Sequence, residues 1–368
     1  MAKRIGLDCR LVGTKHTGIG RYILALVPEL VRQAPPDYHW ILFVADKDQE
    51  ALFKKRLPEG ASVEIRPAPI RHYSLAEQLI LPFIFIKAKL DLLHVPHFNT
   101  ALLYPKKTVL TVHDLLWHKQ TGRSVTTLPP WLYRAKHLAY RLVVAQATER
   151  AKAILVPSKQ TKKDLLDYKL GLKPKIHLTY EGVLLPKKVT PPDKLPPKDY
   201  LLYVGSLYPH KNVRVLLQAL ALTPKENLVI VSARNIFQQE IKTLVKRLKL
   251  TSRVIFFDWL NDARLGWLYK HAKALVQPSL HEGFGLTGIE ALSYNTPVIA
   301  SDIPVFHEVY QDVARFFPPK NPQKLAKLIG QDKKRLKKTV SAKKLLKRYN
   351  WSRCANKTLA VYEKVLQT

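Results

Sequence analysis

The sequence predicts an α/β protein of two domains, each built from a parallel sheet covered by helices. Its 368 residues are enough for about two domains, at roughly 150 residues per domain. Short apolar runs rich in β-branched residues alternate with segments of helical periodicity, which is the pattern of parallel sheets with helical crossovers. Residues 185–198 contain five prolines and interrupt this alternation, which then resumes. We therefore expect two Rossmann-like, doubly wound domains joined by an extended linker.

The first half begins with an expected strand over residues 4–12, a glycine-containing loop over 13–20 and a helix over 22–30. More strand-like runs follow, and a long helical pattern precedes the last of them. These expected strands are 40–45, 62–66, 90–95, 108–112 and 153–157, and the long helix is 131–150.

The second half repeats this rhythm. Its expected elements are strand 200–205, helix 213–222, strand 228–232, helix 236–248, strands 254–257, 274–277 and 297–301, and a final helix over 351–366. The domain boundaries that follow are 1–186 for the first domain, 187–199 for the linker, 200–350 for the second domain and 351–368 for a terminal segment that returns to the first domain. Because ligands of such sheets bind at the carboxyl ends of the strands, we expect the two domains to face each other across a cleft.

Charge is the unusual feature of the composition. The chain has 61 Lys and Arg against 28 Asp and Glu, a formal net charge of +33. Its 46% of hydrophobic residues is ordinary for a globular protein and excludes a chain that is disordered throughout. A charge of this size attracts nucleic acid, anionic lipid or phosphorylated substrates. Residues 320–348 alone hold 12 Lys and Arg and a single acid, Asp332.

The cysteine content, the first residues and the longest apolar stretch indicate the cellular compartment in which we expect the protein. Cys9 and Cys354 are the only cysteines, which excludes a disulfide framework and a CxxC zinc pair and fits a reducing cytoplasm. The first residues carry charges and lack the apolar core of a signal peptide. The most apolar stretch, 78–86, is far shorter than the about 20 residues that a spanning helix needs. We expect a cytoplasmic protein that can bind the inner face of the cell membrane peripherally.

The strongest motif is residues 278–301, PSLHEGFGLTGIEALSYNTPVIAS. A glycine-containing loop follows the expected strand 274–277, and a helix is expected to start near Leu286 and Thr287. Gly283 and Gly285 allow the backbone to approach a ligand closely. The helix N-terminus offers free N–H groups to phosphate or sugar oxygens.

Two carboxylates accompany this loop. Glu282 lies in the loop and Glu290 lies about one turn into the helix, so we expect both to point into one crevice. Carboxylates accept hydrogen bonds from paired hydroxyls, which a ribose and a hexose both present. The motif therefore predicts a site for a ligand rich in hydroxyls.

This string resembles the Glu-x7-Glu region of retaining GT-B glycosyltransferases, in particular glycosyltransferase family 4 (glycosyl transferases group 1). Further blocks resemble the family in the same order. They are residues 11–23 (LVGTKHTGIGRYI), 109–114 (VLTVHD), 153–164 (AILVPSKQTKKD), 200–217 (YLLYVGSLYPHKNVRVLL) and 254–272. The resemblance implies a GT-B fold and transfer of a hexose, of mannose or glucose type, from a nucleotide-diphosphate sugar to a glycan or lipid-linked acceptor with retention at the anomeric carbon.

The resemblance also implies roles for single residues. Glu290 would hold the ribose, Glu282 the sugar hydroxyls, and Lys211 the diphosphate, whose developing charge it would stabilise. The other implied donor contacts are Gly18, Gly20, His210, Leu260, Phe284, Gly285, Leu286 and Thr287. A solvated side chain is the alternative for Lys211. Residues 257–260 (FDWL) stand where the family's backbone contacts the base, and ordinary core packing is the alternative for this aromatic stripe.

His113 closes an expected strand of the first domain. The resemblance implies that it faces the donor sugar, where we expect it to position and polarise rather than act as a general base; a satisfied core histidine is the alternative. Residues 17–21 (TGIGR) lack the third glycine of a dinucleotide fingerprint, so NAD binding is not expected, and a plain tight turn is the alternative. The family usually has a second basic residue either five positions before the lysine or directly before it, and these positions are Ser206 and His210 here. The second charge is therefore missing, or it is supplied by His210 or by Arg234.

We expect no cofactor and no essential metal. Asp46 and Asp48 have the spacing of a metal-binding DxD motif, but the local sequence predicts a solvated turn and a helix start. The HKN sequence at 210–212 resembles mannosyl- and other hexosyltransferases, which favours GDP-mannose over UDP-glucose as the donor.

Three alternatives remain open from the sequence. A GT-B sugar-nucleotide epimerase would consume the donor without an acceptor, and a phosphorylase would need a lysine for pyridoxal phosphate, for which no site is evident. A basic nucleic-acid-binding protein would account for the charge, but no recognition motif supports it and no nucleic acid partner is expected.

Segments of the first domain mix apolar and cationic side chains, as a surface that binds an anionic membrane does. They are residues 71–73, residues 79–86 with Lys87 and Lys89, and residues 131–134. Buried elements edged by lysines would give the same pattern.

Overall fold

The computed structural model describes residues 2–13, 17–119, 129–233, 236–336 and 342–368. They divide into two compact units. The N-terminal unit contains the described residues up to His118, those from 129 to Gly182, and Asn350–Thr368. The C-terminal unit is built from Val183–Tyr349. Each unit has its own sheet and its own core.

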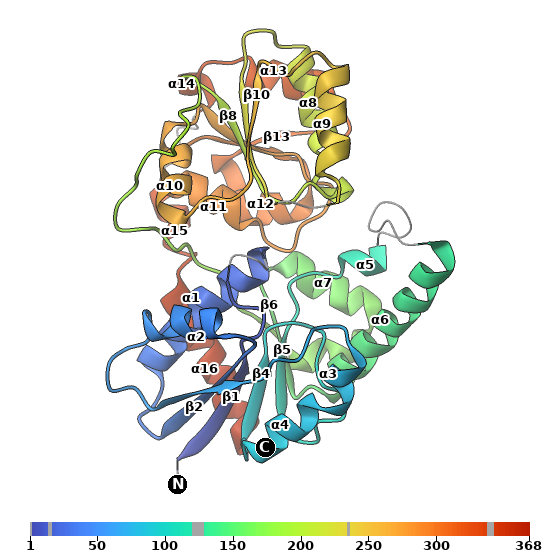
Figure 1. The fold of residues 1–368 in the computed structure, drawn as a ribbon, viewed down its shortest axis with the longest axis vertical. Helices are drawn as coiled ribbons and strands as arrows, with labels where there is room; N and C mark the ends of the chain where they lie inside the picture. Colours follow the sequence, from blue (N-terminus) through green and yellow to red (C-terminus); the bar gives the residue numbers. More distant parts are fainter. Residues whose placement is uncertain (1, 14–16, 120–128, 234–235, 337–341) are drawn as a thin grey trace. The chain divides into compact units, whose positions relative to one another are not determined.

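The N-terminal unit is organised by a seven-stranded parallel sheet of order β3-β2-β1-β4-β5-β6-β7 (Figure 1). Its strands are β1 (Lys3–Asp8), β2 (Tyr38–Val44), β3 (Val63–Pro67), β4 (Leu92–Val95), β5 (Thr108–Thr111), β6 (Ala153–Val156) and β7 (Ile176–Leu178). The order reverses between β1 and β4, where Leu7 pairs with His94. Ligands of open parallel sheets bind outside the carboxyl ends of the strands at such a reversal.

Helices connect these strands. They are α1 (Thr17–Gln33), α2 (Lys47–Lys54), α3 (Leu75–Leu79), α4 (Leu81–Lys87), α5 (Leu116–Lys119), α6 (Pro130–Arg150), α7 (Lys159–Tyr168), the 3₁₀ helix η3 (Leu170–Lys175) and α16 (Trp351–Gln367). The terminal helix α16 packs on α1 and against β4 and β6. Its buried Tyr362 hydroxyl lies 2.5 Å from His94 Nδ1, which joins the end of the chain to the centre of the first sheet.

The start of α1 differs from the sequence prediction. A loop was expected up to residue 20, but the helix begins at Thr17, so Gly18 and Gly20 lie in its first turn. A Cβ at Gly20 would lie 1.9 Å from the carbonyl oxygen of Gly13, so only glycine allows the helix start to pack there. The prediction took the glycines as a sign of a loop and was wrong. Gly20 lies inside the helix because the helix packs so closely on Gly13 that no Cβ fits there.

The C-terminal unit is organised by a six-stranded parallel sheet of order β10-β9-β8-β11-β12-β13 (Figure 1). The strands are β8 (Leu201–Val204), β9 (Leu228–Val231), β10 (Val254–Phe257), β11 (Ala274–Gln277), β12 (Val298–Ser301) and β13 (Arg315–Phe317). The helices are α8 (Val213–Ala221), α9 (Gln238–Arg247), α10 (Asp262–His271), α11 (Leu286–Ser293), α12 (Pro304–Tyr310), α13 (Pro322–Ile329), α14 (Lys333–Leu336) and α15 (Ala342–Leu346), with 3₁₀ turns η4 (Pro209–Lys211) and η5 (Gln311–Val313). Here too the strand order reverses, between β8 and β11.

Residues 187–199 contain neither helix nor strand and lie along α10. The Thr190 amide donates to the Ala263 carbonyl at 3.2 Å, and Asp193 pairs with Arg264 at 2.6 Å. Among the described residues, none of the helices is long and apolar enough to cross a membrane.

Candidate active site

The loops that follow β8 and β11 meet in the C-terminal unit because these strands are neighbours in the sheet. The first loop runs into η4 and ends at Asn212, whose φ of +55° is left-handed. The second loop connects β11 to α11. The Leu280 amide donates to the His210 carbonyl at 2.8 Å, which joins the two loops directly.

This arrangement brings Lys211 and Glu282 together across 71 residues of sequence. Lys211 Nζ donates to Glu282 Oε1 at 2.7 Å, and Ser279 Oγ donates to the same oxygen at 2.8 Å. Burial acts to raise the pKa of Glu282, but the Lys211 ammonium and the Ser279 hydrogen bond outweigh it and hold that pKa below its usual value. The loop therefore presents an ionised carboxylate beside a fixed ammonium, and both side chains keep some contact with solvent.

Glu290 occupies a different environment from Glu282. It lies one turn into α11, as expected, and its side chain is buried. Its Oε2 accepts a hydrogen bond from the Tyr269 hydroxyl of α10 at 2.8 Å. The two glutamates of the motif thus belong to one structural unit, in which Glu282 pairs with Lys211 and Glu290 accepts from Tyr269.

Gly285 shapes the turn before α11. Its φ is +105°, and a Cβ there would lie 2.4 Å from the Tyr310 hydroxyl, so no other residue fits without displacement. That hydroxyl lies 2.6 Å from the Gly285 carbonyl oxygen and also contacts Gln277 Oε1. Gln277 Nε2 in turn donates to Thr287 Oγ1 at 2.6 Å. Tyr310 and Gln277 therefore hold the helix start that was predicted to meet the donor.

Sequence reasoning did not identify Tyr310, Gln277 or Asn212. Asn212 Nδ2 donates to the carbonyls of Pro278 at 3.0 Å and Pro319 at 2.7 Å, which ties the lysine loop to the glutamate loop. Asn212 follows Lys211 directly in the HKN string, and the tolerance of asparagine for left-handed backbone was the signal that the sequence offered. The contacts of Tyr310 are made through the tertiary fold and leave no local pattern.

The remaining residues of this unit that were predicted to contact the donor differ in burial and position. The Phe284 ring is buried and packs edge-on against Tyr349, with the two ring centroids 5.4 Å apart. Leu260 is partly buried just beyond β10, and His210 lies in η4 beside Lys211. Arg234, the alternative second cation, lies outside the described residues.

The predicted residues of the N-terminal unit lie near the carboxyl end of its sheet. His113 follows β5, with Nδ1 at 3.3 Å from Glu181 Oε1 and Nε2 at 3.2 Å from the Pro96 carbonyl. Both ring nitrogens therefore face acceptor groups, and the Glu181 side chain is buried. Glu181 was not identified from the sequence.

Gly18 and Gly20 differ in their surroundings. A Cβ on Gly20 would collide with the backbone, as described above, whereas one on Gly18 would meet no heavy atom within 4 Å. Packing therefore explains the glycine at position 20 and leaves the glycine at position 18 open to a role in ligand binding.

Asp46 is the N-cap of α2 and accepts from the Gln49 amide at 2.8 Å, as the prediction of a helix start required. Within the described parts of the chain, no group of three or more His, Cys, Asp or Glu side chains is placed to hold a metal ion.

Comparison with known proteins decides the family. Residues 3–185 match the family model described as Glycosyltransferase Family 4, and residues 188–348 match the one described as Glycosyl transferases group 1. The chain belongs to glycosyltransferase family 4. The resemblance drawn from its motifs is thereby confirmed.

Curated relatives of this family 4 glycosyltransferase include O-antigen chain mannosyltransferases. One is O-antigen chain mannosyltransferase B of Escherichia coli, which is 25% identical over an alignment of 379 positions. The alignment covers 94% of this chain and 96% of the relative. Another is RfbU of Salmonella typhimurium, 33% identical over 220 residues, which cover 58% of this chain and 61% of the relative.

Solved structures similar to this glycosyltransferase include sucrose-phosphate synthase from Thermosynechococcus elongatus, with a TM-score of 0.73 and 19% identity over 99% of both chains. The catalytic domain of starch synthase IV from Arabidopsis thaliana has a TM-score of 0.67 and 11% identity over 100% of both chains. At these identities the similarity concerns the fold alone. The predicted two-domain GT-B fold is confirmed.

Proposed function

We propose that this glycosyltransferase transfers mannose from GDP-mannose to a lipid-linked glycan, with retention at the anomeric carbon. The observation that carries the proposal is the pairing of Lys211 with Glu282 beside the start of α11. Two relatives are O-antigen chain mannosyltransferases by name, which supports mannose as the sugar and a glycan as the acceptor. UDP-glucose is the second donor to test.

The C-terminal unit would bind the donor. Lys211 is already held by Glu282, so its ammonium is positioned before a diphosphate arrives. The start of α11 has no side-chain cap. The Gly288 N–H donates to the Gly285 carbonyl at 3.1 Å, whereas the N–H groups of Leu286 and Thr287 would be available to phosphate or sugar oxygens. Glu282 would accept hydrogen bonds from the sugar hydroxyls, and Glu290, oriented by Tyr269, would accept them from the ribose.

The chemistry would proceed on one face of the sugar. The bond from C1 to the diphosphate oxygen breaks, and its electron pair stays on the diphosphate, whose growing charge Lys211 stabilises. The acceptor hydroxyl oxygen bonds to C1 from the same face, and its proton passes to a diphosphate oxygen. No protein general base is then required, which agrees with the arrangement of His113, whose two ring nitrogens both face acceptors.

The reaction would need no metal, because Lys211 and the helix N–H groups supply the charge compensation. We expect full activity in EDTA. Loss of transfer in EDTA and recovery with Mg²⁺ or Mn²⁺ would contradict this part of the proposal.

The site of action would be the cytoplasmic face of the cell membrane, where a lipid-linked acceptor presents its glycan. The glycosyl group would then be added to a growing polysaccharide, as the names of the O-antigen relatives suggest.

The test is transfer from GDP-[¹⁴C]mannose to lipid-linked oligosaccharides extracted from O-antigen-producing bacteria. We expect acceptor-dependent incorporation of label and an α-linked product by NMR, since the donor is α-linked. Consumption of the donor without acceptor would indicate the epimerase alternative, and a β-linked product would contradict retention.

A further inference from the structure

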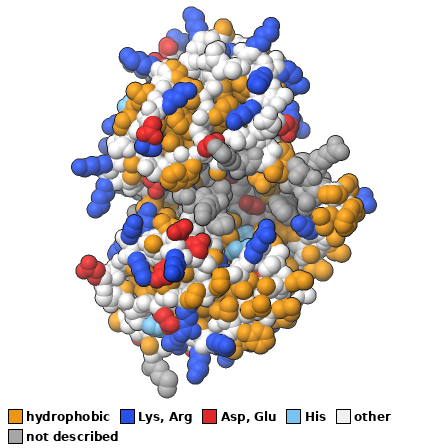
Figure 2. Space-filling view, in the orientation of Figure 1, with side chains coloured by type: hydrophobic (Ala, Val, Ile, Leu, Met, Phe, Trp, Pro, Cys, Tyr) orange, Lys and Arg blue, Asp and Glu red, His pale blue; other side chains and the backbone are white. Residues whose placement is uncertain are grey.

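The α3 and α4 helices of the N-terminal unit expose an apolar face that packing does not use. Leu75, Leu79, Phe83 and Ile86 are separated by four, four and three residues, so they line one side of the two helices. The exposed apolar side chains of this segment are Tyr73 (65% exposed), Leu75 (82%), Leu79 (59%), Ile80 (50%), Phe83 (64%) and Ile86 (44%). Figure 2 shows hydrophobic side chains gathered over this part of the unit. We call these six residues the α3–α4 face.

The opposite side of the same segment is buried and already attaches it to the fold, so the exposed face is not needed for that attachment. Leu81, Phe85 and Ala88 are fully buried in the core of the unit. Burial of one side of a helix is sufficient to fold it on the sheet. Exposed apolar area on this scale marks an interaction surface more often than a feature of the isolated fold.

The exposed charged side chains of residues 68–90, the segment that carries the α3–α4 face, are all basic; the exposed Asp91 follows this segment, and the Asp114 charge acts on Tyr73. Arg71, Lys87 and Lys89 are exposed at its two ends. The single acid between residues 68 and 90 is Glu77, which is fully buried. The surface therefore combines a broad apolar centre with a cationic edge, within a chain of net charge +33.

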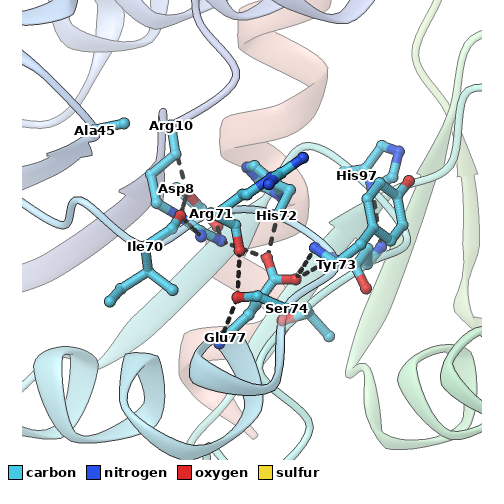
Figure 3. Close-up of polar contacts among 12 residues, drawn as sticks. Asp8, Arg10, Ala45, Ile70, Arg71, His72, Tyr73, Ser74, Glu77 and His97 are labelled. Carbon is cyan, nitrogen blue, oxygen red and sulfur yellow. Dashed lines mark hydrogen bonds and ion pairs between the residues drawn. The ribbon is translucent and has the colours of Figure 1, made fainter.

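Buried polar contacts fix this segment in place (Figure 3). Ser74 caps α3 by accepting from the Glu77 amide at 3.3 Å, and Glu77 Oε2 accepts from the Tyr73 amide at 2.7 Å. Glu77 also accepts from Arg10 Nη2 at 2.9 Å and from Asn99 Nδ2 at 2.5 Å. Glu77 thus joins the start of α3 to the loops that follow β1 and β4.

Arg10 extends this attachment to the sheet. It donates to both oxygens of Asp8, at 2.8 and 2.7 Å, and to the Ile70 carbonyl at 2.9 Å. His72 Nδ1 lies 3.0 Å from Glu77 Oε1, beside them in Figure 3. The α3–α4 face is therefore ordered in the folded protein, so little conformational entropy would be lost when it docks.

A second helix of the unit has the same character. Trp131, Leu138 and Leu142 of α6 are 72%, 61% and 55% exposed, and their spacing of seven and four places them on one side. Arg134 and Arg141 lie on the same helix and are exposed.

We infer that the α3–α4 face docks on the surface of a bilayer that contains anionic lipid, and that α6 adds to this contact. An apolar face buried among acyl chains with cations at the headgroups is the arrangement of interfacial helices. A second copy of the chain is disfavoured as the occupant because it would bring the same cationic edge and the same net charge of +33. This inference deepens the proposed function, on which it rests for its biological sense, by naming the surface on which the acceptor is met.

The test is flotation of the full chain with vesicles of phosphatidylcholine and phosphatidylglycerol in a 3:1 ratio. We expect binding that falls at least tenfold in Leu79→Asp/Phe83→Asp and on pure phosphatidylcholine vesicles. The matched control, Leu170→Asp/Leu222→Asp, adds the same charge at side chains that are 73% and 54% exposed elsewhere, and it should bind within twofold of wild type. Equal binding by both double variants, or equal binding to both vesicle types, would overturn the inference.

Two further measurements distinguish membrane docking from self-association and from an effect on the donor site. Sedimentation equilibrium without lipid should give a monomer for all three proteins; a wild-type dimer that only Leu79→Asp/Phe83→Asp dissociates would assign the face to a second copy and overturn the inference. GDP-mannose titration should give equal affinities for all three. Vesicle binding without any mannosyl transfer would count against the proposed function alone, and transfer without specific vesicle binding would count against the docking surface alone.

Discussion

The carboxyl edges of the two sheets hold different chemistry at the same topological position. In the C-terminal unit, the loops after β8 and β11 present the Lys211–Glu282 pair with part of both side chains in solvent. In the N-terminal unit, the charges at this edge are enclosed, because Arg10, just after β1, pairs with both Asp8 and Glu77 and all three side chains have almost no exposure.

This difference indicates what each edge is for. A charge pair that can exchange its partner for a ligand suits a diphosphate and a sugar. A charge cluster that satisfies itself cannot bind a ligand without breaking, but it can hold a surface segment in position. The proposed division of labour is therefore donor binding by the C-terminal unit and acceptor and membrane contact by the N-terminal unit.

The largest effect that would test this comparison is on transfer. Lys211→Ala removes the cation next to the leaving diphosphate, and we expect kcat/KM to fall by about 10³-fold. Lys246→Ala removes an exposed lysine of α9 and should leave transfer within twofold. Circular dichroism should show the same fold for both variants, and near-normal turnover of Lys211→Ala would contradict the donor site.

Glu77→Ala should produce the largest effect on stability in the N-terminal unit. It leaves the buried Arg10 with one carboxylate fewer, and breaking a buried ion pair costs about 3–5 kcal/mol. Denaturant unfolding should show this loss, while the C-terminal unit should keep its affinity for GDP-mannose. A loss below about 1 kcal/mol would mean that the cluster does not hold the α3–α4 segment.

Acid should weaken the N-terminal unit. Burial lowers the pKa of His94 and of His97 to about 3, whereas both titrate near 6.5 in the unfolded chain. Below pH 6.5 the unfolded state therefore binds more protons, and stability falls by up to about 1.4 kcal/mol per pH unit for each histidine until the folded pKa is reached. Denaturant unfolding at pH 7.5 and pH 5 measures this, and His97→Gln should reduce the difference. Equal stability at both pH values would show that these histidines are not held neutral.

Tyr310→Phe should have the smallest effect of the four. The change removes the hydroxyl that contacts Gly285 and Gln277 but keeps the ring. We expect kcat/KM to fall several-fold, which corresponds to about 1 kcal/mol for a lost hydrogen bond that orders the start of α11. A positioning role predicts that transfer falls more than stability does. An unchanged kcat/KM with lowered stability would show a structural role alone.

The sequence was sufficient for the fold class and most elements because alternation of apolar runs with helical periodicity is a local signal. It missed β7 and β13, which have three residues each and too few side chains to show a pattern. It also did not assign the helices α3, α4, α7, α12 and α13. It placed the start of α1 too late because local propensity assigns glycine to loops. The glycine at position 20 is instead required by a tertiary contact with Gly13, which the local sequence cannot show.

The candidate site was predictable where its residues form a contiguous motif, as Glu282 and Glu290 do. The residues that orient the site, Tyr310, Asn212 and Glu181, were missed because their partners are distant in sequence. The exposure of the α3–α4 face was also beyond the sequence, since residues 79–86 look the same whether they are covered or not.

The proposed function depends on binding of a nucleotide-diphosphate sugar by the Lys211–Glu282 site of the C-terminal unit. Isothermal titration of the full chain with GDP-mannose, UDP-glucose and GDP measures this binding, with Lys211→Ala and Lys246→Ala titrated alongside. We expect wild type and Lys246→Ala to bind GDP-mannose equally and Lys211→Ala to bind it at least 30-fold more weakly. Absence of nucleotide-sugar binding in wild type, or equal affinity in Lys211→Ala, would contradict the proposed function.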